Sequence, residues 1–120
     1  MEKNRFLLKF IPRFELDLNE ILDYITFKLH DQESALKLVD KIEKAILARL
    51  ECPLSFERFQ SNRRRKHPYY RIYVDNFVVY YVVIENVMEV RRVLYKSRNA
   101  EKIIKYKNRL NIKNILKTIS

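Results

Sequence analysis

Residues 69–95 read YYRIYVDNFVVYYVVIENVMEVRRVLY, three runs of β-forming residues separated by the polar dipeptides Asp75-Asn76 and Glu85-Asn86. Two-residue connections between such runs are a strong signal for β-hairpins. The chain contains no glycine, so we expect the two asparagines to supply the positive φ that tight turns require. The stretch therefore predicts a three-stranded antiparallel meander.

The two faces of this predicted sheet differ in polarity. In the simplest register, residue 74 lies opposite residue 77 and residue 84 opposite residue 87, and side chains alternate between the faces. The face that we expect to be covered is almost wholly apolar and comprises Tyr70, Ile72, Val74, Phe77, Val79, Tyr81, Val83, Met88, Val90, Arg92 and Leu94. A cross-strand row marks the face that we expect to be open, namely Arg71, Tyr80 and Arg91, with Tyr73, Glu89 and Tyr95 nearby.

Each arginine of the meander has a structural alternative to a functional role. Arg71 can pair with Glu57 or Glu89, and Arg91 can pair with Glu89, as is common on protein surfaces. Arg92 falls on the covered face. There it either extends its head group to the sheet edge or is turned to the open face by a β-bulge.

The residues before the meander predict a strand and a helical hairpin. Residues 6–11 predict a strand that ends at Pro12, which suits the start of a helix over residues 13–30. Asp31 can cap a second helix over residues 32–51, which stops before Pro53. Apolar stripes at helical spacing should cover the sheet: Leu18, Ile21, Leu22, Ile25 and Leu29, then Ala35, Val39, Ile42, Ile46 and Leu50. The prediction is an α+β domain of two layers.

The C-terminal part of the chain predicts one more helix, which Asn99 can cap. We expect one domain over residues 1–107 and a basic helical extension over residues 108–120. Cys52 is a lone cysteine near the end of the second helix, where we expect it to be small and partly buried.

Basic residues outnumber acidic ones by 25 to 15, a net charge of +10. They concentrate in two runs on either side of the meander, one over residues 58–71 and one over residues 99–120. Such runs are often only solvated surface, but here they flank an arginine-bearing sheet face and favour a polyanionic partner.

The composition also excludes several classes of function. Without glycine the chain has no P-loop, dinucleotide fingerprint or nucleophile elbow. It has no metal-ligand spacing around its cysteine, and no apolar run of about 20 residues that could span a membrane. We therefore expect a cytoplasmic protein without metal or other cofactor.

The order of elements carries a resemblance to a known family. FIPRFELDLNEILDYI (residues 10–25), YRIYVDNFVVYYVV (70–83) and VRRVLYKSRN (90–99) occur in the order strand, helical hairpin, basic loop, meander and terminal helix. Over about 100 residues this resembles the RelE/ParE superfamily, toxins of bacterial type II toxin–antitoxin modules with a microbial-ribonuclease-like fold. Arg92-Val93-Leu94-Tyr95, followed by Arg98, is similar to the ParE side. The resemblance implies a cognate antitoxin as partner.

The resemblance also separates two activities, since RelE-type toxins cleave mRNA on the ribosome and ParE-type toxins poison DNA gyrase. Arg71 and Arg98 match basic positions of the nuclease. Val78 and Ile104 stand where RelE-type toxins carry an arginine and a tyrosine. The chain is therefore expected to be ParE-like. If it is instead a ribosome-dependent endonuclease, the catalytic candidates are Arg71, Arg91, Arg98 and Tyr95.

Other residues are candidates for binding the target or nucleic acid: Arg63, Arg64, Arg65, Lys66, His67, Tyr73, Tyr80 and Lys96. Two further hypotheses remain open. A basic nucleic-acid-binding module without toxicity would bind RNA or DNA with a steep salt dependence. An inactive relative would bind an antitoxin and be harmless on expression.

Overall fold

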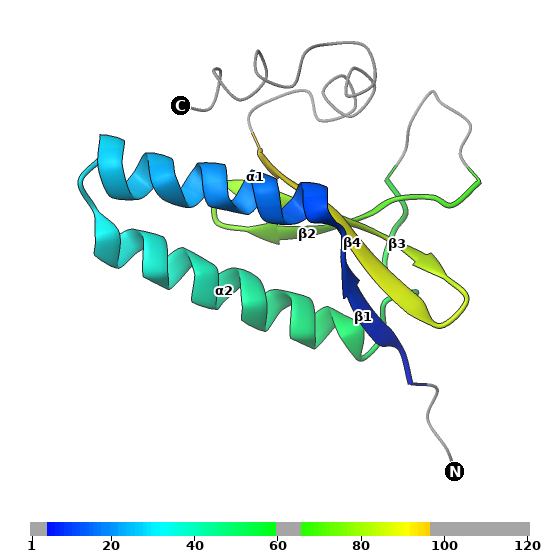
Figure 1. Ribbon diagram of the computed structural model, residues 1–120. Coiled ribbons are helices and arrows are strands. Elements are labelled where there is room, and N and C mark those ends of the chain that lie inside the picture. The colour runs from blue at the N-terminus through cyan, green and yellow to red at the C-terminus, as the bar shows by residue number, and fades with distance from the viewer. Residues whose placement is uncertain (1–4, 60–65, 97–120) are drawn as a thin grey trace.

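A four-stranded sheet packed against two helices forms the two layers of the molecule (Figure 1). The computed structural model describes residues 5–59 and 66–96. The strands are β1 (Leu7–Phe10), β2 (Tyr70–Val74), β3 (Phe77–Ile84) and β4 (Val87–Tyr95). The helices are α1 (Pro12–Asp23), a π-helical turn η1 (Tyr24–Lys28), and α2 (Gln32–Leu50). The predicted α+β class is confirmed, and the predicted terminal helix lies outside the described residues.

The sheet order is β1-β4-β3-β2. The meander is antiparallel, and β1 joins it as a parallel neighbour of β4, with Leu7 opposite Val87 and Phe10 opposite Val90. The helical hairpin connects β1 to the meander and lies across one face of the sheet (Figure 1). The N-terminal strand therefore completes the sheet as predicted.

Helix boundaries follow local signals in the sequence. Pro12 occupies the first turn of α1, where its missing N–H costs nothing. The side chain of Asp31 caps α2 by accepting from the backbone N–H of Ser34 at 3.1 Å and from its hydroxyl at 2.6 Å. The first helix does not continue regularly to residue 30 as predicted, because its last turn is π-helical.

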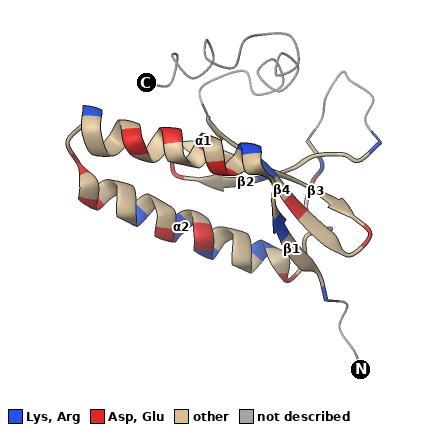
Figure 2. Cartoon of the chain, in the orientation of Figure 1, with Lys and Arg blue, Asp and Glu red and all other residues tan. Residues whose placement is uncertain are grey.

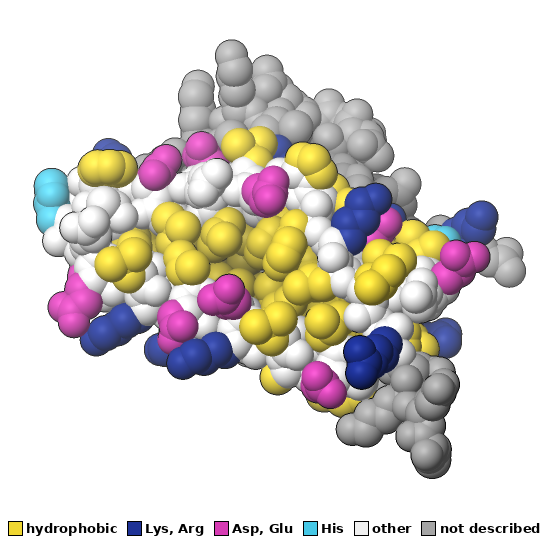
Figure 3. Space-filling view, turned by 60° about the horizontal axis from the view of Figure 1, so that its bottom comes forward, with side chains coloured by type: hydrophobic (Ala, Val, Ile, Leu, Met, Phe, Trp, Pro, Cys, Tyr) yellow, Lys and Arg dark blue, Asp and Glu magenta, His cyan; other side chains and the backbone are white. Residues whose placement is uncertain are grey.

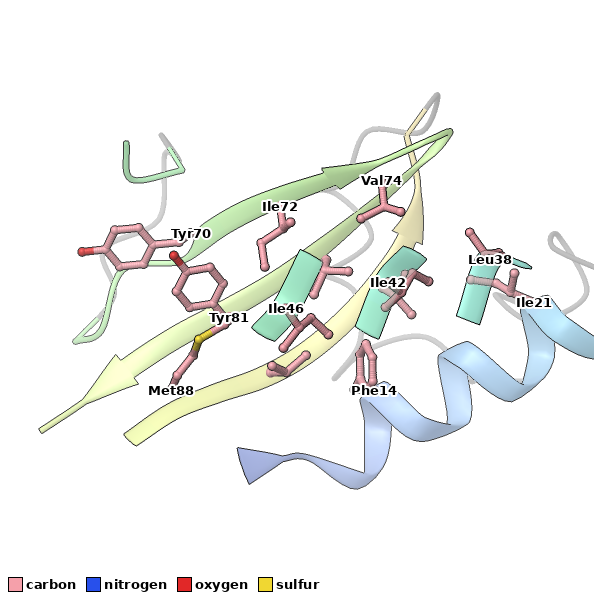
Figure 4. Packing of buried hydrophobic residues seen from close by; sticks show 13 residues of the cluster. Phe14, Ile21, Leu38, Ile42, Ile46, Tyr70, Ile72, Val74, Tyr81 and Met88 are labelled. Atoms are coloured by element: carbon pink, nitrogen blue, oxygen red, sulfur yellow. The ribbon is translucent and has the colours of Figure 1, made fainter. Parts of the chain in front are cut away.

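The main core lies between the helices and one sheet face. Figure 4 shows side chains from α1, α2 and the strands interdigitating there. The predicted stripes are largely confirmed, with Ile21, Ile42 and Ile46 buried, but Leu29 is exposed. Cys52 is also exposed, contrary to expectation.

The two hairpin turns use positive φ at their first residues. Asp75 has φ 52° and Glu85 has φ 57°, so the expectation that the asparagines take this conformation is wrong. Aspartate is one of the residues enriched in the left-handed region, whereas glutamate takes it less often. The predicted pairing of residue 74 with 77 and of residue 84 with 87 is confirmed.

A β-bulge in β4 changes the register halfway along the strand. Tyr81 pairs with Val90, but Tyr80 pairs with Arg92, so Arg91 is the extra residue. Tyr80 was expected opposite Arg91, and that part of the predicted row is wrong. Beyond a bulge, each later side chain of the strand moves to the other face.

The exchange of faces is visible in the packing of the strand end. Val93, expected on the open face, lies in the main core with the helices. Leu94, expected in that core, lies in a second cluster on the opposite face with Tyr69, Val78, Tyr80 and Val82. The second face of the sheet is therefore partly covered, whereas the sequence predicted an open one.

Candidate functional site

Arg71 on β2 forms an arginine–aromatic surface with Phe59 and Tyr73 on the second sheet face. Its guanidinium lies 4.8 Å from the ring centroid of Phe59 and 5.7 Å from that of Tyr73. Cation–π contacts of this kind contribute ~0.5–1 kcal/mol at exposed sites. Glu89 pairs with Lys9 and Arg91 instead. Within the described residues Arg71 is therefore stacked rather than ion-paired.

Backbone contacts fix both sides of this surface. The N–H of Phe59 donates to the carbonyl of Tyr69 at 2.7 Å, beside an isolated bridge between Arg58 and Tyr70. Nη1 of Arg49 donates to the carbonyl of Arg71 at 2.9 Å. The end of α2 and the segment after it thus hold the start of β2 in place. Tyr73 is 58% exposed and is available to a partner.

Arg49 is also the centre of a second set of contacts behind this surface. Its Nη1 donates to the hydroxyl of Tyr81 at 2.9 Å, and that hydroxyl donates to the carbonyl of Pro53 at 2.7 Å. The ring of Phe56 lies 3.4 Å from the guanidinium carbon of Arg49. Burial raises the pKa of Tyr81, although the bond from Arg49 opposes the shift. These contacts attach the segment after α2 to the sheet.

Arg91, the bulge residue, is held by Glu89 on the same strand. Its Nε and Nη2 donate to Oε1 of Glu89 at 3.1 and 2.9 Å. Burial by itself lowers the pKa of Arg91, but hydrogen bonds with Tyr69 and Glu89 outweigh it, so the pKa is raised. The structural alternative for Arg91 is confirmed, because Glu89 pairs with it.

Tyr80 is buried beneath the arginine–aromatic surface. It is 2% exposed, and its ring meets those of Phe59 and Tyr69 edge-on at 5.6 and 6.3 Å. Burial raises the pKa of Tyr80 to about 12, even with Arg71 nearby. The expectation that Tyr80 contacts a target directly is wrong because the segment containing Phe59 folds over it.

Tyr95 does not lie with Arg71 and Arg91. Because of the bulge it sits opposite Phe77, with ring centroids 5.6 Å apart, and Phe77 packs on the main core. The predicted grouping of Tyr95 with these arginines is therefore wrong. The backbone N–H of Lys96 donates to the carbonyl of Asn76 at 2.7 Å, and its side chain is exposed.

The predicted basic loop is described only at its end. Lys66 is exposed and His67 is half-buried at the entrance to β2. The remaining candidates lie outside the described residues: Arg63, Arg64, Arg65, Arg98 and Ile104. Figure 2 shows basic and acidic residues mixed over the helices, so no single face of the hairpin is uniformly basic.

Asp17 and Arg92 form a buried ion pair that the sequence reasoning missed. Nε and Nη2 of Arg92 donate to Oδ2 and Oδ1 of Asp17 at 2.6 and 3.0 Å, and the N–H of Val93 donates to Oδ2 at 3.2 Å. Arg92 is 2% exposed. The β-bulge considered from the sequence is present and sets Arg92 opposite Tyr80, but the guanidinium is buried at Asp17 of α1 and does not reach solvent. The available signal was Asp17 itself, a carboxylate at helical spacing with Phe14 and Ile21.

The described part of the chain offers no obvious place for a metal. Within residues 5–59 and 66–96, no three His, Cys, Asp or Glu side chains are placed to hold a metal ion. None of the described helices combines the length and apolarity that crossing a bilayer requires.

Comparison with known proteins gives the family. Residues 8–100 match the model for the ParE toxin of the type II toxin–antitoxin system parDE. The chromosomal ParDE toxin–antitoxin system from P. aeruginosa contains a chain with a similar fold (TM-score 0.64, 18% identity, covering 78% of this chain and 98% of that one). A chain of the RelB–RelE antitoxin–toxin complex from Methanococcus jannaschii matches more weakly (TM-score 0.44, 21% identity, covering 82% and 98%).

The comparison with curated protein sequences returned no match. The family match covers most of the chain, from β1 through the end of the meander. It agrees with the order of elements and with the resemblance carried by the sequence motifs. The chain belongs to the ParE family of toxins from type II toxin–antitoxin systems.

Proposed function

We propose that this toxin arrests growth by binding a macromolecular target of the DNA gyrase type, without cleaving RNA, and that a cognate antitoxin neutralises it. The observation that carries the proposal is which contacts the basic and tyrosine side chains of the second sheet face make. Most of them are already engaged in holding the fold together, and the arginine–aromatic surface is the part left for a partner.

Metal-free RNA cleavage requires a base for the 2′-hydroxyl, an acid for the leaving oxygen and cationic stabilisation of the phosphorane. Val78, at the position where RelE-type toxins carry an arginine, is buried. Arg91 is paired with Glu89, and Tyr80 holds its proton with a pKa of about 12. Among the described catalytic candidates, Arg71 is the cation that no carboxylate pairs with, which supports binding over catalysis.

The arginine–aromatic surface has the composition of a protein-binding site. Arginine and tyrosine are enriched among the residues that dominate binding energies. The side chain of Arg71 is stacked on Phe59, and Arg49 holds the backbone of the same residue. Less side-chain freedom is therefore lost when a partner binds. Tyr73 presents a large, exposed ring next to it.

The helical hairpin offers a different surface to the antitoxin. Figure 3 shows a band of hydrophobic side chains over the hairpin, bordered by charged groups of both signs. Leu36 and Leu47 of α2 and Phe27 of η1 are about half-exposed or more. An apolar band with a charged rim is typical of a surface that binds an amphipathic segment. The ParDE system with the similar fold is a toxin–antitoxin system, as the proposal requires here.

Induced expression with and without the adjacent gene tests the proposal. We expect growth arrest that the neighbouring gene relieves, with intact mRNA and altered plasmid supercoiling. Arrest with mRNA cut at codon boundaries would establish the RelE-type activity instead. No arrest would leave the nucleic-acid-binding module or the inactive relative.

Variants of the arginine–aromatic surface test the site itself. Arg71→Ala and Tyr73→Ala should each relieve growth arrest, because both remove exposed contacts to the target. Lys44→Ala is the matched control, since Lys44 is an exposed cation on α2 that pairs with Asp40. If the Arg71 and Tyr73 variants arrest growth as strongly as Lys44→Ala does, another surface binds the target.

A further inference from the structure

The buried ion pair of Asp17 and Arg92 includes a third charged group. Nε of Arg13, on the first turn of α1, lies 3.3 Å from Oδ1 of Asp17 without the geometry of a hydrogen bond. Two guanidinium groups therefore share one carboxylate, and the cluster of Arg13, Asp17 and Arg92 carries one excess positive charge. A buried charge without compensation is costly, so such a cluster normally contains a second acceptor.

The hydrogen-bond donors of this cluster outnumber its acceptors. Asp17 already accepts three bonds, from two nitrogens of Arg92 and the backbone of Val93. Nε and Nη1 of Arg13 and Nη1 of Arg92 are buried and have no acceptor among the described residues. Unsatisfied buried donors are rare in folded proteins and require an explanation, such as a missing ligand or water.

Arg13 gives the cluster a route to the surface. Its side chain is 17% exposed, whereas those of Asp17 and Arg92 are buried. Burial lowers the pKa of Arg13 and the charge of Arg92 acts in the same direction, while Asp17 and Glu20 oppose the shift. A group that reached Arg13 from outside would therefore meet a partly desolvated, fork-shaped donor.

We propose that the cluster of Arg13, Asp17 and Arg92 is an acceptor site for one carboxylate side chain of the antitoxin. This inference rests on the proposed function. A carboxylate supplies one negative charge and two acceptor oxygens, which matches the excess charge and the planar donors of a guanidinium. Only 17% of the Arg13 side chain is exposed, and acidic and basic residues are mixed over the helices, which favours a single glutamate or aspartate of a peptide over a nucleic-acid backbone.

Binding of full-length antitoxin to the full-length toxin, measured by calorimetry, tests this inference. Arg13→Gln should weaken binding by about ten- to a hundredfold, as expected when one partner of a buried charge pair is removed. Without antitoxin, the melting temperature of Arg13→Gln should equal or exceed that of the unchanged toxin, because the variant lacks the excess positive charge of the cluster. Arg13→Lys should restore part of the affinity. Lys9→Gln is the matched control and should bind like the unchanged toxin, since Lys9 is an exposed cation of β1 that pairs with Glu89, away from the helical hairpin.

The acidic partner is identified by replacing each Asp and Glu of the toxin-binding part of the antitoxin by its amide. One of these antitoxin variants should bind the unchanged toxin more weakly than the unchanged antitoxin does. The same variant should bind Arg13→Gln no more weakly than the unchanged antitoxin binds it. Equal binding by Arg13→Gln and the unchanged toxin would overturn the inference, as would a loss of affinity matched by an equal loss of thermal stability.

Two further outcomes distinguish a carboxylate of the antitoxin from one of the toxin itself, and a failure of this inference from a failure of the proposed function. Glu101→Gln replaces the acidic side chain of residues 99–120. If it lowers the melting temperature of the toxin but not that of Arg13→Gln, the carboxylate comes from the chain itself, and the inference is overturned. If the antitoxin binds neither toxin, the proposed function fails, and this inference fails with it.

Discussion

Two neighbouring arginines of β4 lie in different environments. Arg92 is buried in an ion pair with Asp17 on α1. Arg91 is half-buried and pairs with Glu89 of its own strand. The first pair joins residues 75 positions apart in the sequence, and the second joins residues two positions apart. The same residue type therefore stabilises packing between helix and strand in one place and local surface structure in the other.

Removing the carboxylate of the buried pair should give the largest effect. Asp17→Asn leaves the guanidinium of Arg92 buried without a counter-charge, and breaking a buried pair in this way costs about 3–5 kcal/mol. Glu89→Gln breaks the pair with Arg91, which is partly exposed, and should cost about 1 kcal/mol or less. Urea denaturation of both variants measures the difference. Equal losses would show that the environments of the two arginine pairs do not differ as described.

A second prediction compares the inner and outer sides of α2. Ile42 is buried against the sheet, and Ile42→Ala should lower the free energy of unfolding by about 2–5 kcal/mol through lost contacts and a cavity. Leu47 is half-exposed, so Leu47→Ala should change the free energy of unfolding by about 0.5 kcal/mol or less. In contrast, Leu47→Ala should weaken antitoxin binding. A large loss of stability in Leu47→Ala would place this side chain in the core.

Titration of Tyr80 tests whether the second face is covered. Its pKa is about 12 in the folded chain, and an unfolded tyrosine titrates near 10. The folded state binds this proton more tightly, so the contribution is complete below about pH 10 and is lost as the pH rises towards 12. Stability should therefore fall less steeply over this interval in Tyr80→Phe. Parallel stability curves for the two proteins would show that Tyr80 is accessible to water.

The smallest effect is expected at the exposed start of α2, away from both faces. Asp31 caps this helix through Ser34, and this hydrogen bonding lowers the pKa of Asp31. Its contribution is present above the unfolded pKa and is lost as the pH falls through the folded one. Asp31→Ala should lower the melting temperature slightly at neutral pH and not at pH 2. A loss of equal size at both values would point to a role other than capping.

Short-range patterns were sufficient to predict most of the fold. Two polar dipeptides set the hairpin registers, Pro12 and Asp31 marked the helix starts, and helical spacing identified the buried Ile42 and Ile46. These features depend on residues a few positions apart, so the chain carries them locally. The family resemblance likewise rested on the order of these elements, and it is confirmed.

The site required the tertiary structure. The bulge at Arg91 moved Tyr95 and Val93 to the helix-covered face, and the sequence offered a bulge here only as one of two possibilities. The segment around Phe59 covered Tyr80 because packing over a long connection decides burial there.

The chain by itself determined its strands, helices and family, because hydrophobic periodicity, turn dipeptides and caps act over a few residues. The tertiary structure alone decided which arginine is stacked on aromatic rings, which is paired at the surface and which is buried. Arg71, Arg91 and Arg92 are chemically identical, and their roles follow from the groups that folding brings to them: Phe59, Glu89 and Asp17. Two of these three partners lie at least 12 positions away in the sequence, so the local sequence pattern does not predict the pairing.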